Sequence, residues 1–230
     1  MITEDVSALP TLERYRRAFA ALSRVLADPT RTEDVLEFTT YINANARPDR
    51  LDFFFADPAG QRLFAEHRAI DSRLDLDALD ALPDGTLGHA YARFLRDRGL
   101  TPDVFDGPPD GIRDERAAYA IQRLRQTHDL WHVVTGYDTD PASEIALQGF
   151  TFAQLRAPGS FFLAAAGMAR GMREKPTLPK EVLAGFRAGK RAGKLATFAW
   201  EDHWATPLAE VRRMLKIVPV TYGVAARAAA

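Results

Sequence analysis

The spacing of apolar residues along the chain predicts helices. A first helix is expected from Leu12 to Ala27, because large apolar side chains recur every three or four residues on one stripe, formed by Tyr15, Phe19, Leu22 and Leu26. No segment alternates convincingly between apolar and polar residues with period two, and β-branched residues are sparse. We therefore predict an all-α fold, a single-domain bundle of about eight to ten helices over residues 1–230.

Proline, glycine and short polar residues indicate where these helices begin and end. Asp28-Pro29 and Pro48 are expected to close the first two helices, because the residue before proline is driven out of the helical region. Asp57-Pro58 is a typical helix start, and Gly99 and Gly136 are typical helix terminators. The expected layout is N-terminal helices over 1–80, a core over 82–217 and a loose tail over 224–230.

One long central helix is expected from Arg113 to Thr135. A single stripe of this helix combines apolar residues with two histidines, in the order Ala117, Ile121, Leu124, His128 and His132. Polar residues off the stripe are expected to face water, namely Arg123, Arg125 and Gln126. The buried face of the helix should therefore present two imidazoles.

These histidines form part of a candidate metal site. Residues four apart share a helix face, so His128 and His132 point the same way. Asp129 is adjacent, and Glu144 follows His132 by twelve residues. Imidazole and carboxylate together suit zinc, iron or manganese. The alternative is a pair of core histidines with satisfied hydrogen bonds, but burying so many ionisable groups without a metal would be costly.

The amino-acid composition excludes several kinds of chemistry and of binding partner. The chain has no cysteine, which excludes disulfides, thiol nucleophiles and iron–sulfur clusters, so any metal must use nitrogen and oxygen ligands. The formal net charge is −1, which gives the whole chain no attraction to nucleic acid. Hydrophobic residues make up 47% and charged residues 27%, which is ordinary for a soluble globular protein.

Membrane contact is expected to be peripheral. The N-terminus has Glu4 and Asp5 and no apolar run, so we expect neither a signal nor a transit peptide. The longest apolar candidate, Phe161 to Ala169, falls far short of the roughly 20 residues that span a bilayer. Gly185 and Gly189 are spaced for close helix packing and lie among basic residues without a phosphate-loop pattern. Those basic residues either rest on anionic lipid or form a solvated face, and the sequence favours the solvated face.

The sequence leaves open the roles of two clusters of residues that are rich in aromatic side chains. Side chains of three segments would either fill the core or line an apolar cavity for a long hydrocarbon tail, and the candidates for the cavity are Tyr91, Phe94, Phe150, Phe152, Phe161 and Phe162. Trp200, Glu201, His203 and Trp204 form a second cluster, interpreted as a packing seam in which Glu201 could support the metal site.

The motif resembles that of a known family. His-Asp-x-x-His followed by eleven residues and Glu is similar to the pattern of the coenzyme Q (ubiquinone) biosynthesis protein 4 family. The similarity extends to flanking segments, Thr86–Tyr91, Thr127–Asp138 (THDLWHVVTGYD), Glu144–Leu147 and Trp204–Ile217, and so covers roughly residues 82–217.

The resemblance implies a commonly dimeric, all-helical protein with a divalent metal at His128, Asp129, His132 and Glu144. Zinc is the expected metal, with iron, manganese or magnesium as alternatives. The implied activity is a late step of ubiquinone biosynthesis, in which a lyase decarboxylates a polyprenylated hydroxybenzoate, with or without hydroxylation at the same ring carbon. Tyr91, Phe94, Phe150 and Phe161 would then contact the polyprenyl lipid.

The resemblance also implies partners and a location. The chain is expected to form a homodimer. It is expected to bind other ubiquinone-biosynthesis enzymes and a membrane surface, but not nucleic acid. The composition rich in Arg, Ala and Asp, and the expected absence of a transit peptide, favour a bacterial source. The expected location is therefore the cytoplasm of a bacterium, peripheral to the inner membrane. Two other classes stay open. One is a non-catalytic prenyl-lipid-binding scaffold that presents quinone precursors to partner enzymes. The other is a metal-dependent phosphohydrolase, which usually needs a further upstream histidine and a distant aspartate that we cannot assign.

Overall fold

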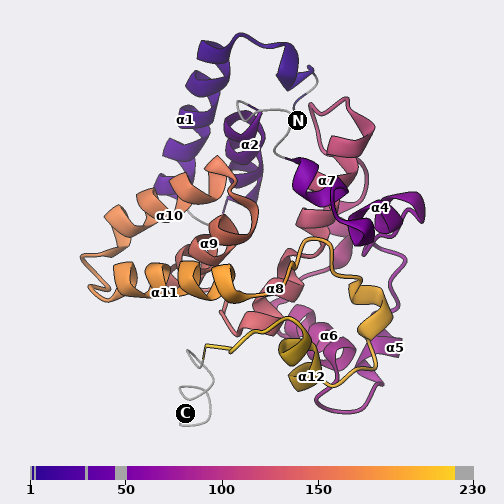
Figure 1. The fold of residues 1–230 in the computed structure, drawn as a ribbon. Coiled ribbons are helices and arrows are strands. Elements are labelled where there is room, and N and C mark those ends of the chain that lie inside the picture. Colours follow the sequence, from indigo (N-terminus) through magenta and orange to yellow (C-terminus); the bar gives the residue numbers. More distant parts are fainter. Residues whose placement is uncertain (1, 3, 29–30, 45–50, 221–230) are drawn as a thin grey trace. The chain divides into compact units, whose positions relative to one another are not determined.

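The fold is all-helical over the residues that the computed structural model describes, which are 2, 4–28, 31–44 and 51–220 (Figure 1). These residues contain twelve α-helices, which confirms the predicted fold class. The number exceeds the expected eight to ten because very short helices such as α3 (Asp52–Phe55) and α5 (Leu76–Asp80) leave no periodic signal. Within this part of the chain, none of the helices has the length and apolar character needed to cross a membrane. The expected stops at Pro29 and Pro48 and the tail over 224–230 fall outside the described residues.

Contacts group the chain into two compact units. Unit 1 comprises Met1–Arg50, Asp110–Arg113 and Thr139–Lys190, and unit 2 comprises Leu51–Pro109, Asp114–Asp138 and Arg191–Ala230. The prediction of one domain over residues 1–230 stays a prediction.

Unit 1 is built from five helices, α1 (Thr11–Ala27), α2 (Thr32–Asn43), α9 (Pro141–Leu155), α10 (Pro158–Gly171) and α11 (Leu178–Arg191). Two glycines permit close helix packing. A Cβ on Gly149 would lie 2.5 Å from the carbonyl oxygen of Val182, and one on Gly189 would lie 2.6 Å from that of Phe150. The predicted packing role is therefore confirmed for Gly189.

Helix α1 buries only part of the predicted stripe, namely Leu22, with Leu26 packed against the same core. Its buried residues are Ala18, Ala21, Leu22 and Val25. Tyr15 and Phe19 of the predicted stripe are 39% and 43% exposed. The reason is that α1 packs mainly on α2 through small side chains, which places the larger aromatic rings at the margin of that contact.

Unit 2 contains the remaining helices: α3, α4 (Pro58–Ala65), α5, α6 (Leu87–Arg98), α7 (Glu115–Gln126), α8 (His128–Thr135) and α12 (Leu208–Met214). The side chain of Asp57 caps α4, and Pro58 occupies its first turn, as predicted. Gly99 and Gly136 both end their helices in the left-handed conformation, which confirms them as terminators.

The predicted long helix from Arg113 to Thr135 is wrong in two respects. It is divided at Thr127 into α7 and α8, and α7 buries Ala120, Arg123 and Gln126, whereas the residues Ala117, Ile121 and Leu124 of the predicted stripe are only partly buried. Arg123 and Gln126, expected to face water, are buried. The physical reason is a partner distant in sequence. The Arg123 guanidinium donates to both oxygens of Glu201, at 2.5 and 2.8 Å, and so satisfies its charge away from solvent.

Candidate metal centre

Helix α8 carries both histidines on one face, as predicted. The ring centroids of His128 and His132 lie 4.8 Å apart with the ring planes at 68°. His132 is buried, whereas 34% of the His128 side chain is exposed. The four-residue spacing brings the two imidazoles together because it is close to one helical turn.

The ring of His132 is fixed on both its edge and its face. Its Nδ1 lies 3.1 Å from the carbonyl oxygen of Tyr137. A carbonyl only accepts hydrogen bonds, so Nδ1 carries the proton and the lone pair of the neutral ring belongs to Nε2. Phe94 of α6 stacks on this ring at 5.6 Å, and the Arg98 guanidinium covers the Phe94 ring at 3.9 Å. This arrangement presents Nε2 as a metal ligand.

Hydrogen bonds also fix the position of the C-terminal end of α8. Gly136 closes the helix with a φ of 79°, and its N–H donates to the His132 carbonyl at 2.8 Å. The guanidinium of Arg212 donates to the carbonyls of Val133 and Val134 at 2.9 Å each. Burial lowers the pKa of Arg212 below its ordinary value. A cation at a helix C-terminus offsets the partial negative charge there, so Arg212 stabilises the helix that carries the histidines.

Glu144 comes from the first turn of α9. The side chain of Asp140 caps this helix by accepting from the N–H groups of Ala142 and Ser143. A helix N-terminus favours a carboxylate in its first turn. Ser143 itself lies inside the helix, which begins at Pro141.

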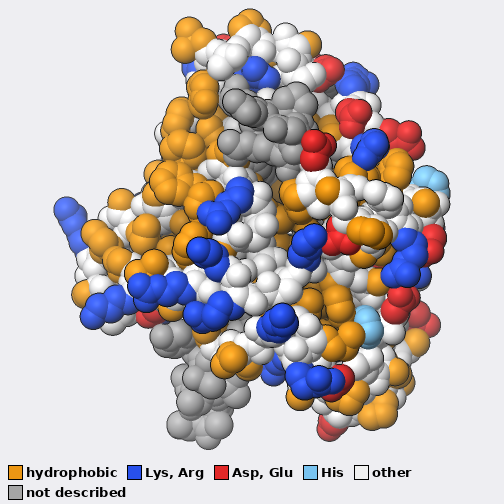
Figure 2. All heavy atoms as spheres, viewed as in Figure 1, with side chains coloured by type: hydrophobic (Ala, Val, Ile, Leu, Met, Phe, Trp, Pro, Cys, Tyr) orange, Lys and Arg blue, Asp and Glu red, His pale blue; other side chains and the backbone are white. Residues whose placement is uncertain are grey.

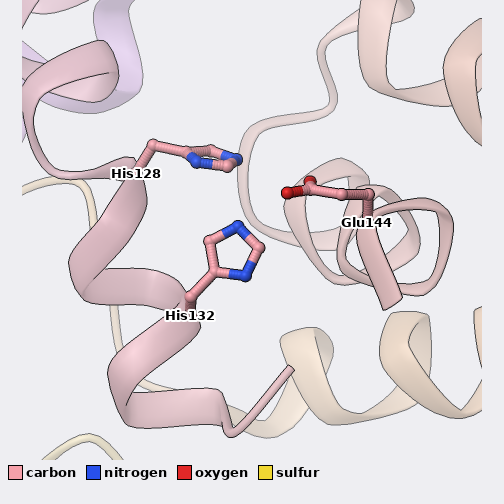
Figure 3. A group of neighbouring side chains, drawn as sticks. All are labelled: His128, His132 and Glu144. Carbon is pink, nitrogen blue, oxygen red and sulfur yellow. The ribbon is translucent and has the colours of Figure 1, made fainter. Parts of the chain in front are cut away.

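His128, His132 and Glu144 form a group of candidate ligands (Figure 3). Each residue offers one ligand atom, and these atoms all lie within 4.8 Å of one another. Imidazole nitrogen and carboxylate oxygen are atoms that bind zinc, with bonds of about 2.0–2.2 Å. Two imidazoles and one carboxylate are a donor set found in catalytic zinc sites, where a fourth position stays open. The residues therefore fit a divalent metal.

Asp129, predicted as a fourth ligand, is not one of this group. Its Oδ1 lies 3.8 Å from Nδ1 of His128, which is within ion-pair range but too long for a hydrogen bond. Burial, together with the charge of Asp129, raises the pKa of Tyr91. Tyr91 therefore stays a neutral hydroxyl near the site, and the catalytic role of Asp129 stays a prediction.

The four aromatic residues predicted for the substrate pocket have different surroundings. Tyr91 is buried in unit 2, where it stacks on Trp204, and Phe94 stacks on His132. Phe150 is buried in unit 1, whereas Phe161 is 50% exposed there. Their contact with a lipid tail stays a prediction.

The role of Arg212 at the C-terminal end of α8 is not apparent from the sequence. No local pattern could have revealed it, because the guanidinium meets carbonyls 78 and 79 residues earlier in the chain. A basic residue in the last turn of a helix is ordinarily interpreted as a surface charge.

Comparisons with known proteins show the family to which the chain belongs. The family model described as "Coenzyme Q (ubiquinone) biosynthesis protein Coq4" matches residues 5–221. The mitochondrial ubiquinone biosynthesis protein COQ4 of Pyricularia oryzae is 33% identical over 221 residues, covering 90% of this chain and 70% of that protein. The Xenopus laevis homologue is 32% identical over 217 residues, covering 92% of this chain and 76% of that protein.

A solved structure is similar as well. The crystal structure of a proposed ubiquinone biosynthesis protein from Nostoc punctiforme superposes with a TM-score of 0.71 at 31% identity. The match covers 87% of this chain and 97% of that chain. The family model spans nearly the whole sequence, and the relatives exceed 30% identity over most of their length. The chain therefore belongs to the coenzyme Q (ubiquinone) biosynthesis protein Coq4 family.

Proposed function

We propose that the chain acts in ubiquinone biosynthesis as a metal-dependent decarboxylase of a polyprenylated hydroxybenzoate. The observation that carries the proposal is the group formed by His128, His132 and Glu144 in a chain of this family. The pathway is inferred from the relatives, which are both named as ubiquinone biosynthesis proteins. The donor set supports the chemistry, because three protein ligands leave a position for substrate.

The proposed reaction replaces a ring carboxylate by hydrogen. The bond between the ring carbon and the carboxyl carbon breaks, carbon dioxide leaves, and the electron pair stays on the ring carbon until a proton joins it. When bound, a divalent cation such as zinc supplies Lewis acidity that stabilises negative charge on substrate oxygen. The two imidazoles and Glu144 would hold the cation, and the charge of Glu144 would set how electrophilic it is.

Neighbouring residues orient this machinery. The Tyr137 carbonyl together with the Phe94 ring aligns His132, and the Asp129 carboxylate lies beside the His128 ring. Tyr91 supports the proposal as a hydroxyl that stays protonated, because burial and the nearby carboxylate both oppose its ionisation. A neutral hydroxyl can donate a hydrogen bond to a substrate oxygen without adding charge to the site.

The experiment compares turnover with binding in Glu144→Gln. Carbon dioxide release from a prenylated hydroxybenzoate should fall by at least the roughly 10–100-fold that removing an outer partner of a metal ligand costs. Affinity for a prenyl analogue without the carboxylate should change little, because tail binding depends on apolar surface. Glu174→Gln is the matched control, since Glu174 is exposed and should keep full turnover.

The result also separates an enzyme from a scaffold. Carbon dioxide release at the uncatalysed rate by both wild type and Glu144→Gln, with analogue binding intact, would favour the lipid-presenting scaffold. The assay is repeated in an extract from cells that lack the protein, so that missing partner enzymes are supplied. Restoration by wild type and Glu174→Gln, but not by Glu144→Gln, is the result the proposal predicts.

A further inference from the structure

One arginine of unit 2, Arg98, contacts both neighbours that fix the ring of His132. It is the last residue of α6, and 17% of its side chain is exposed. Its guanidinium lies over the Phe94 ring at 3.9 Å, and Phe94 stacks on His132. Its Nη2 donates to Oδ1 of Asp138 at 2.5 Å. Asp138 directly follows Tyr137, whose carbonyl oxygen lies 3.1 Å from Nδ1 of His132. One side chain therefore reaches both the face and the edge of the imidazole.

The ion pair with Asp138 fixes the acceptor on the edge of the imidazole. The Tyr137 carbonyl and the Asp138 nitrogen belong to one planar peptide group, so an anchor on Asp138 also sets the direction of that carbonyl. The preceding residue, Gly136, constrains the backbone less than any other residue type would. Without the carbonyl as acceptor, the neutral imidazole could carry its proton on either nitrogen.

The contact with Phe94 fixes the ring that stacks on the imidazole. The guanidinium lies over the Phe94 ring, and its Nη1 donates to the Phe94 backbone carbonyl at 3.2 Å. Attraction between a cation and the face of an aromatic ring favours this placement. A planar guanidinium can stack on a ring and donate from its edge at the same time, whereas the point-like ammonium of lysine cannot. Arginine therefore suits this position better than lysine.

An ordinary surface ion pair is the alternative explanation for the contact between Arg98 and Asp138. Figure 2 shows basic and acidic side chains intermingled over the helices of unit 2, and exposed pairs of this kind contribute little. Arg96, on the same helix, forms such a pair with two aspartates of α5, and 39% of its side chain is exposed. Arg98 differs because it is less exposed and lies against the ring of Phe94.

We propose that Arg98 is a positioning residue for the metal group and acts through Phe94 and Asp138 to present Nε2 of His132 to the cation. With both neighbours held, Nδ1 keeps its proton and Nε2 keeps its lone pair. Outer partners of this kind set the orientation and tautomer of a ligating histidine. The inference rests on the metal group of the proposed function and is independent of the decarboxylation.

The test compares Arg98→Met, Asp138→Asn, their combination and a matched control, Arg96→Met. Both arginines lie in the last turn of α6, so the control loses the same charge from the helix end. When metal-depleted protein is titrated with zinc in a calorimeter, Arg98→Met should bind about 10–100-fold more weakly than wild type. Asp138→Asn should lose less, because the contact with Phe94 remains. The double variant should bind no more weakly than Arg98→Met, because Asp138 acts through Arg98. The control should bind like wild type.

A second measurement needs no metal. In metal-free protein labelled with ¹⁵N-histidine, nuclear magnetic resonance should show the proton of His132 on Nδ1, in a signal assigned by its absence from His132→Ala. Arg98→Met and Asp138→Asn should mix the two tautomers and speed exchange of this proton, while circular dichroism shows unchanged helix content. Asp138→Asn is the milder substitution and carries the test if Arg98→Met does not fold.

Three results would overturn the proposal: an unchanged Nδ1 signal in Arg98→Met, zinc binding by that variant as tight as by wild type, or equal losses in the control. Losses that simply add in the double variant would also count against it, because the two residues would then act separately. Wild type that binds no zinc would contradict the proposed function instead, and the Nδ1 signal alone would then decide the positioning role of Arg98.

Discussion

Replacing Glu201 by leucine should destabilise unit 2 strongly, because it removes the partner of a fully buried cation. The Arg123 side chain is 0% exposed, and that of Glu201 is 16% exposed. Both guanidinium Nη atoms donate to the carboxylate, and Nη2 also lies 3.3 Å from the Phe198 carbonyl. Breaking a buried pair from one side costs about 3–5 kcal/mol, and a single remaining carbonyl cannot replace the carboxylate.

Removing the other partner of the pair, by Arg123→Met, should lower the free energy of unfolding by less. Glu201 keeps some access to water and still has the Arg68 guanidinium at 3.9 Å, so its charge is not stranded. The double variant Arg123→Met/Glu201→Leu removes both charges and should be less destabilised than Glu201→Leu alone, because a buried ion pair replaced by apolar residues is often close to neutral.

The assay is urea unfolding followed by circular dichroism on the four proteins of this double-mutant cycle. An exposed pair supplies the control, since Arg213→Met next to Glu210 should cost under about 1 kcal/mol. If the two single losses simply add in the double variant, the pair has no coupling energy and this reasoning is refuted.

Two further predictions concern backbone contacts. The Tyr119 hydroxyl donates to the carbonyls of Leu63 and Arg68, and burial raises its pKa to about 12. The stability that it contributes is therefore fully present below its ordinary pKa of 10 and lost as pH rises through 12, so Tyr119→Phe should cost about 1 kcal/mol at neutral pH and remove this alkaline step in urea unfolding. Gly136→Ala should cost at least about 1–2 kcal/mol, since φ is +79° and a Cβ would lie 2.5 Å from the Val220 carbonyl oxygen; an unchanged thermal midpoint would contradict this.

Local features of the fold could be read from the sequence. The four-residue spacing of His128 and His132 fixes their shared face through helix geometry alone, and Glu144 follows after a short connection. Gly99 and Gly136 were recognised as helix ends because glycine adopts the left-handed conformation at no cost.

Features that depend on distant partners could not be read in this way. Arg123 has the periodicity of a surface residue, and its burial depends on a carboxylate 78 residues later. The apolar pattern of α1 showed that it is a helix, but which side it buries is decided by the residues of α2 against it. The partly exposed Tyr15 and Phe19 are the consequence.

The most direct test of the central claim is metal binding by the His128, His132 and Glu144 group. Protein purified without chelator is analysed for its elements, and metal-depleted protein is titrated with zinc in a calorimeter. Wild type should contain a divalent metal and take it up again after depletion. His128→Ala/His132→Ala should do neither while circular dichroism shows most of its helix content retained, because the site adds to an existing core. Wild type that holds no metal and takes none up, or a double variant that binds as wild type does, would contradict the account.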